Sequence, residues 1–189
     1  MAKVGDEVLE AWSKILNAMP EAILRLQSKQ MGDLKIAEQF VRRLHIQGID
    51  PVRVSLCGGM SRNAYMAAHG EVDLILDTFP YPGGTTTCEA LWMGVPTLTL
   101  TGKSMISRQG VSLLTAAGLA DWVAASEADY VAKAIVIASD LPKLATLRTQ
   151  LRQKVLASPL FDAPRFARYF EAALWGMWES WQKNQGRAV

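Results

Sequence analysis

The sequence has few cysteines, no long apolar run and no strong excess of either charge, and each shortage excludes a class of protein. Its two cysteines, Cys57 and Cys88, lack the spacing to other cysteines or histidines that zinc sites and disulfide scaffolds show. No run approaches the roughly 20 apolar residues that a membrane span needs. No basic, apolar leader opens the chain either. We therefore expect a soluble, cytoplasmic protein with buried free thiols.

The charges are close to balance, with 20 lysines and arginines against 18 aspartates and glutamates. Non-specific nucleic-acid binding needs a concentrated positive charge, so no nucleic-acid partner is expected. No cluster of carboxylates indicates a metal site, and we expect no metal. The 189 residues are half apolar, enough to bury a full core, and are most simply one domain over residues 1–189.

Two common phosphate-binding fingerprints, G-x-x-x-x-G-K-[ST] and G-x-G-x-x-G, are also absent. The most informative stretch is instead 74–102, LILDTFPYPGGTTTCEALWMGVPTLTLTG. An apolar run leads into a loop of prolines and glycines, then a threonine triplet, a segment of helical period and a second β-prone run. This order predicts strand, loop, helix and strand, the unit that builds parallel sheets.

The loop of this unit is a candidate ligand site. Gly83 and Gly84 allow the backbone to come close to a ligand, and Thr85, Thr86 and Thr87 supply hydroxyl and N–H groups at a helix start. The N-terminus of a helix favours anions. Threonine is also a good N-cap, so the loop alone is equally consistent with a capped helix after a tight turn.

The rest of the chain alternates between helical and β patterns over its first two thirds. The patterns predict helices over 6–19, 33–47, 61–69, 85–94, 107–117, 126–139, 140–156 and 163–183, and strands over 22–26, 52–56, 74–76, 97–100 and 122–123. We expect an α/β fold, an open parallel Rossmann-like sheet with helices on both faces. A ligand should then lie beyond the carboxyl ends of the strands, after Leu56 and Leu76. A doubly wound sheet normally begins with a strand, whereas this chain begins almost at a helix.

The chain resembles the carboxyl-terminal half of the catalytic region of O-linked N-acetylglucosamine transferases, particularly bacterial SPINDLY-like proteins with tetratricopeptide repeats. The resemblance covers nearly all of the sequence. It is carried by VGDEVLEAWSKILNAMPEAILRL at 4–26, LDTFPYPGGTTTCEALWMGVPTLTLTG at 76–102, SRQGVSLL at 107–114, SPLFD at 158–162 and the closing MWE at 177–179. It implies the second lobe of a GT-B glycosyltransferase, the lobe that binds a nucleotide sugar.

The resemblance also implies roles for particular residues. Lys3 falls where the family has a lysine that meets the diphosphate of the donor. The loop residues that match the family's diphosphate site are Gly83, Gly84, Thr85 and Thr86. Glu89 matches an acidic position that accepts from the ribose hydroxyls.

Met60, Arg62 and Tyr65 fall in the segment that faces the uracil and the ribose. Tyr65 stands where the family usually has a histidine stacked on the base, and a tyrosine ring can also stack. His69 is not at the matching place, and we expect it at the surface. The closing tryptophans recur every third residue, which indicates that the last helix packs onto a body, either within this chain or in a part that is missing from it.

By the same resemblance, the intact parent would transfer N-acetylglucosamine, with inversion, from its uridine diphosphate (UDP) sugar to serine or threonine hydroxyls of proteins, without a cofactor. The amino-terminal lobe, the tetratricopeptide (TPR) repeats and the strand that the family places before Lys3 are missing from this sequence. We therefore expect little activity in isolation and possible self-association at the exposed edge. The alternative function is a non-catalytic interaction or nucleotide-sensing module that has kept the fold.

Overall fold

The structure is a computed structural model, and it describes residues 3–185. Short strands alternate with helices through the first two thirds of the chain, as the sequence patterns predict. The strands are β1 (Leu24–Gln27), β2 (Val54–Cys57), β3 (Ile75–Leu76), β4 (Thr97–Leu100) and β5 (Val123–Ala124). The helices are α1 (Asp6–Ala18), α2 (Leu34–Ile46), α3 (Arg62–Ala68), α4 (Thr85–Trp92), α5 (Gln109–Ala116), α6 (Glu127–Ser139), α7 (Leu141–Leu156) and α8 (Ala163–Gln185).

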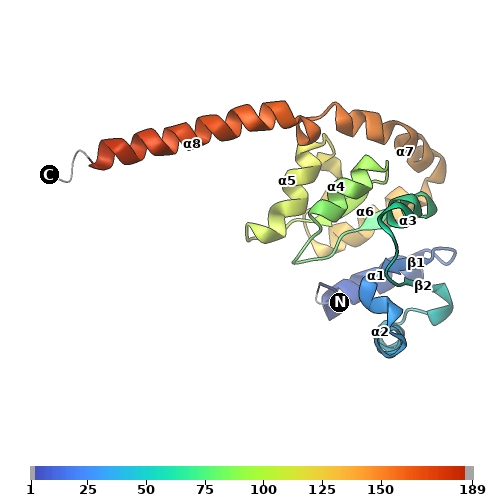
Figure 1. Cartoon of the computed structure of the whole chain (residues 1–189). Helices are drawn as coiled ribbons and strands as arrows, with labels where there is room; N and C mark the ends of the chain where they lie inside the picture. The colour runs from blue at the N-terminus through green and yellow to red at the C-terminus, as the bar shows by residue number, and fades with distance from the viewer. Residues whose placement is uncertain (1–2, 186–189) are drawn as a thin grey trace.

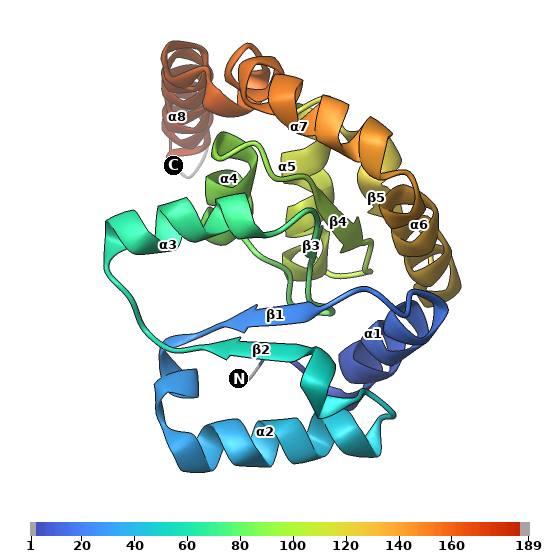
Figure 2. The same cartoon turned by 90° about the vertical axis from the view of Figure 1, so that its right-hand side faces the viewer.

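All of the strand pairs are parallel, which confirms the predicted α/β class. The strands form two groups, β1–β2 and β3–β4–β5, and no hydrogen-bonded ladder within residues 3–185 joins β1 to β3. Figure 2 shows the pair and the triplet of strands as separate groups, with β1 on the side of its group that faces β3. The continuous open sheet expected from the sequence is therefore interrupted in its middle.

Capping residues in the sequence correctly predicted where several helices begin. Ser61 caps α3 by accepting from Ala64 N, and Ser126 caps α6 by accepting from Asp129 N. Strand β2 begins later than predicted because Pro51 opens a short 3-10 turn, capped by Asp50, that occupies the first part of the apolar run. Proline is well suited to the first position of such a turn, since its N–H would be unpaired there in any case.

Two clusters of buried apolar side chains form the core. The larger joins α1, α2 and α6 to the strands and includes Trp12, Phe40, Leu98 and Tyr130. The smaller lies between α4, α5 and α7 and is built around Leu91, Leu114 and Leu151. Each cluster lies under its own set of helices, as expected for helices on both faces of a parallel arrangement.

Helix α8 extends away from the rest of the molecule (Figure 1). Its tryptophans Trp175, Trp178 and Trp181 are about half exposed, so the body that the sequence predicts for them is not supplied by residues 3–185. Trp178 and Trp181 stack on each other, with ring centroids 5.0 Å apart. Within the described part of the chain, every helix is too short or too polar to cross a membrane.

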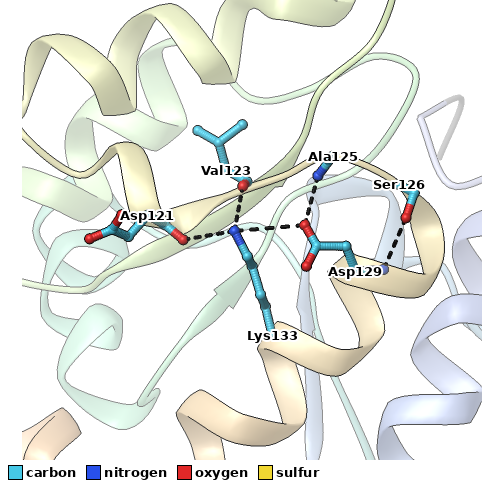
Figure 3. Close-up of polar contacts among 6 residues, drawn as sticks. All are labelled: Asp121, Val123, Ala125, Ser126, Asp129 and Lys133. Carbon is cyan, nitrogen blue, oxygen red and sulfur yellow. Dashed lines mark hydrogen bonds and ion pairs between the residues drawn. The ribbon is translucent and has the colours of Figure 1, made fainter.

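Lys133 of α6 hydrogen-bonds to the backbone at the start of β5. Its Nζ donates to the carbonyl oxygens of Asp121 at 3.1 Å and Val123 at 2.7 Å, and lies 3.7 Å from the carboxylate of Asp129 (Figure 3). Asp129 also accepts from Ala125 N at 2.8 Å. These contacts fix the first turns of α6 beside β5, and the same turns carry Tyr130 toward β3.

Candidate functional site

A cavity of about 500 Å³ lies between β1 and β3, below α3 and beside the loop that leads into α4. Its inner wall is apolar and includes Trp12, Leu26, Ile75 and Leu76. At the carboxyl ends of the strands its wall becomes polar, with Lys3, Tyr65, Asp77, Gly83, Thr86 and Thr87. The cavity reaches the loop after Leu76, one of the two places where the sequence predicts a ligand, but the loop after Leu56 does not line it.

Helix α4 begins without a side-chain cap. Its N-cap residue is Gly84, and the first threonine, Thr85, already lies inside the helix. The alternative that a threonine caps this helix is therefore wrong. Because the first N–H groups of a helix have no partner within it, an uncapped N-terminus presents donors and a partial positive charge to its surroundings. Here those surroundings include the polar end of the cavity, which Thr86 and Thr87 line.

The buried carboxylate of Asp77, directly after β3, holds the loop in place. One oxygen accepts from Gly83 N at 2.7 Å and from Thr78 N at 3.0 Å, and the other accepts from Thr99 Oγ1 at 2.9 Å. Burial raises the pKa of the Asp77 carboxyl above its ordinary value, although these hydrogen bonds and the nearby charge of Lys3 act in the opposite direction.

Aromatic residues support the same loop from the core side. The Tyr130 hydroxyl donates to the Asp77 carbonyl oxygen at 2.9 Å, and Trp12 Nε1 donates to the Tyr130 oxygen at 3.5 Å. Phe79 is buried and packs edge-on against the Tyr130 ring, with centroids 5.4 Å apart. Burial raises the pKa of Tyr130, so the hydroxyl stays a donor at neutral pH. The loop is therefore fixed at both of its ends.

Lys3 lies against the loop, as its predicted role requires. Its ammonium group donates to the Pro82 carbonyl oxygen at 2.9 Å and lies 4.1 Å from the centroid of the Tyr81 ring. Pro82 directly precedes Gly83, so the cation lies close to the N-terminus of α4. Lys3 and the α4 amides thus place two sources of positive potential at one end of the cavity.

Tyr65 lines the cavity, and its hydroxyl is hydrogen-bonded to Glu89, which lies outside the lining. Burial and the neighbouring Glu89 carboxylate raise the pKa of Tyr65 to about 12. Arg62 forms an ion pair with Glu89, whose side chain is largely covered while that of Arg62 is exposed. A ribose hydroxyl that is to reach Glu89 would have to share this carboxylate with Arg62.

The predicted site residues do not all lie in the cavity wall. Lys3, Tyr65, Gly83 and Thr86 line it, while Met60, Arg62, Gly84, Thr85 and Glu89 lie outside its lining. Met60 is 40% exposed. Among residues 3–185, no group of three or more histidine, cysteine, aspartate or glutamate side chains is arranged to hold a metal ion.

Two features of this region differ from the sequence reasoning. His69 is buried rather than at the surface: its Nδ1 lies 3.0 Å from the Tyr65 carbonyl oxygen at the end of α3, and its ring packs edge-on against the Tyr65 ring. Asp77 and its partner Thr99 were not predicted as functional residues. The available signal was a carboxylate directly after an apolar strand, where burial is costly unless the group is paired.

Comparison with known proteins identifies the family of this chain. The family model described as Glycosyl transferase family 41 matches residues 1–170. The chain belongs to glycosyl transferase family 41.

Relatives of this family 41 chain are similar over almost its whole length. It is 41% identical over 190 residues to the probable UDP-N-acetylglucosamine–peptide N-acetylglucosaminyltransferase SPINDLY of Oryza sativa subsp. japonica, covering 100% of this chain and 20% of that protein. It is 40% identical over 179 residues to the protein of the same name in Petunia hybrida, covering 94% of this chain and 19% of that protein.

A solved structure confirms the fold. A mutant of the Thermobaculum terrenum O-GlcNAc transferase matches with a TM-score of 0.90 and 38% identity, over 95% of this chain and 34% of that one. The chain thus spans about a fifth of the curated relatives and a third of the solved chain. The relatives are named as transferases, which does not favour the alternative of a non-catalytic module.

Proposed function

We propose that this chain is the donor-binding part of a protein O-N-acetylglucosaminyltransferase and that its cavity binds UDP-N-acetylglucosamine. The observation that carries the proposal is the convergence of Lys3, the uncapped start of α4 and the Gly83 loop at one end of a cavity. A diphosphate is the anionic group that such a site suits best. The named activity of the relatives supports the choice of sugar and of a protein acceptor.

In this proposal the chain's residues act on the leaving group. The acceptor hydroxyl oxygen bonds to the anomeric carbon, and the bond from that carbon to the diphosphate oxygen breaks with its electrons leaving on UDP. The hydroxyl proton passes to a base. Negative charge grows on the diphosphate as this bond breaks, so donors fixed in advance at that place lower the barrier. Lys3 and the amides of Thr85 and Thr86 are those donors, and Glu89 and Tyr65 would hold the nucleoside.

The acceptor side would come from another part of the enzyme, because glycosyltransferases of this fold work between two lobes. We therefore expect the isolated chain to bind the nucleotide but to transfer little or no sugar. Its partners would be the UDP-sugar, the amino-terminal lobe and, in the intact enzyme, a protein acceptor.

Calorimetric titration of the chain with UDP tests the donor site. We expect saturable binding that Lys3→Ala and Thr86→Ala each weaken roughly 10- to 100-fold, since each loses a contact to a charged group. Lys35→Ala and Thr115→Ala, at exposed positions on α2 and α5, are matched controls that should bind as the unchanged chain does. Equal affinity of all four variants would contradict the proposed site.

A further inference from the structure

Helix α5 brings a polar side chain against the start of α4. Gln109 is the first residue of α5, and the end of its side chain lies beside Gly84. A Cβ atom built on Gly84 would lie 2.7 Å from the amide nitrogen of Gln109 and 3.4 Å from its amide oxygen. The Gln109 amide therefore occupies the space that a side chain at position 84 would need, next to the uncapped N-terminus of α4.

The backbone that carries Gln109 is held on both sides. The next residue, Gly110, packs so closely that a Cβ atom there would lie 3.1 Å from Asp77 Oδ2. In the loop before α5, Ser104 N donates to Ser107 Oγ at 2.9 Å, and Ser107 Oγ donates to the Ser104 carbonyl oxygen at 2.9 Å. The start of α5 is thus fixed beside the loop of the donor site.

The amide of Gln109 is available to a ligand. The side chain is exposed, and it makes no hydrogen bond to any other residue that the structure describes. A primary amide offers both N–H donors and a carbonyl acceptor. Phosphate oxygens mainly accept, whereas sugar hydroxyls both donate and accept. The Gln109 amide is therefore better matched to a sugar hydroxyl than to a phosphate oxygen.

The order of the helices places Gln109 on the side where the sugar would lie. Figure 1 shows α4 between α5 and α3, and α4 contacts α5. Tyr65 of α3 lines the cavity, whereas Gln109 lies outside the lining. In the proposed function the nucleoside lies beside Tyr65 and the diphosphate lies at the start of α4. The sugar is joined to the opposite end of the diphosphate, so it would extend toward α5.

We infer that Gln109 is a sugar-binding residue of the donor site, whose side-chain amide hydrogen-bonds to a hydroxyl group of the donor sugar. The inference rests on the proposed function, since it takes the start of α4 as the diphosphate site. Gly84 has a part in it, because a side chain at that position would displace the amide. Gln109 then contributes to the affinity for the sugar, while Lys3 and the α4 amides contribute to the affinity for the diphosphate.

Calorimetric titrations with UDP and with UDP-N-acetylglucosamine test this inference. We expect Gln109→Leu to weaken binding of UDP-N-acetylglucosamine about 3- to 10-fold, the usual effect of losing one neutral hydrogen bond, and to leave the affinity for UDP unchanged. Gln109→Asn keeps a polar surface but is shorter by one methylene group, so it should show the same selective loss. Gln39→Leu, at an exposed position of α2, is the matched control and should bind both ligands as the unchanged chain does.

Two results would overturn the inference while leaving the proposed donor site in place. The affinities for both ligands could fall equally in the Gln109 variants, in which case the amide contacts the diphosphate and not the sugar. Alternatively, both Gln109 variants could bind UDP-N-acetylglucosamine as tightly as the unchanged chain does. If the unchanged chain bound neither ligand, the proposed function would be contradicted, and this inference with it.

Discussion

Replacing Asp77 with alanine is expected to destabilise the chain by about 3 kcal/mol and to lower its affinity for UDP at least about 100-fold. The carboxylate is buried and accepts from Gly83 N, Thr78 N and Thr99 Oγ1, so the alanine variant leaves buried donors without an acceptor. The loop then loses the hydrogen bond from Gly83 N that holds it beside the cavity. Thermal unfolding measures the first effect and calorimetric titration with UDP measures the second.

Asp77→Asn is the matched variant. Its amide oxygen can still accept from Gly83 N and Thr78 N, and its NH₂ group can donate to the Thr99 hydroxyl. We expect it to keep the loop and to bind UDP at least as tightly, because a negative charge near the diphosphate is removed. If the alanine variant bound UDP as well as the asparagine variant does, the loop would not depend on this residue.

Comparison of the unchanged chain with the Asp77→Asn variant also predicts how the stability of the chain depends on pH. Burial raises the pKa of the Asp77 carboxyl above its ordinary value of 3.8. Its stabilising effect is therefore complete below pH 3.8 and is lost as the pH rises through the raised pKa, because the buried group must then ionise. The asparagine variant cannot ionise at this position. The difference in unfolding temperature between the asparagine variant and the unchanged chain should therefore grow in favour of the variant as the pH rises above 3.8. A difference that stays constant with pH would contradict this account of the carboxyl.

Replacing Gly83 with alanine is expected to lower both the stability of the chain and its affinity for UDP, because the added methyl group has no room. A Cβ atom there would lie 2.5 Å from Thr87 Oγ1 and 2.8 Å from Thr86 Oγ1, closer than real Cβ atoms come to other atoms. Either the threonines or the loop must move. Overpacking of this kind typically costs about 1 to 3 kcal/mol, and we expect UDP affinity to fall at least about 10-fold as the first turn of α4 shifts.

Gly70→Ala is the control for this substitution. A Cβ atom at Gly70 would meet nothing within 4 Å, and this glycine has no left-handed backbone conformation to lose. Its UDP affinity, measured by the same titration, should equal that of the unchanged chain. If Gly83→Ala also bound UDP normally, the close packing of the loop would have no part in ligand binding.

Much of the fold could be predicted from the sequence because its signals are local. Ser61 and Ser126 mark helix starts through bonds to residues within the next turn, and the alternation of apolar runs with amphipathic segments indicates parallel strands. The edge at which we propose that a ligand binds follows from that order of elements. Lys3 and the Gly83 loop came together as the resemblance to the family implied.

The remainder depends on contacts between distant parts of the chain. Asp77 accepts from Thr99, and Tyr130 reaches the Asp77 carbonyl oxygen from α6. The residues next to Asp77 and Tyr130 in the sequence give no indication of these distant partners. The break between β1 and β3 could not be located from the sequence either, since pairing of strand edges is a property of the assembled sheet. The roles of Met60, Arg62, Tyr65 and Glu89 stay predictions.

The central claim is that the start of α4, next to Lys3, binds the diphosphate of a UDP-sugar. Its most direct test is to follow the backbone amide resonances of the chain by NMR during parallel titrations with UDP and with uridine, which lacks phosphate. We predict that UDP shifts the amides of Thr85, Thr86 and Thr87 in a saturable way and that uridine leaves them in place. Equal shifts with both ligands, or no shift of these amides while UDP binds elsewhere, would contradict the claim.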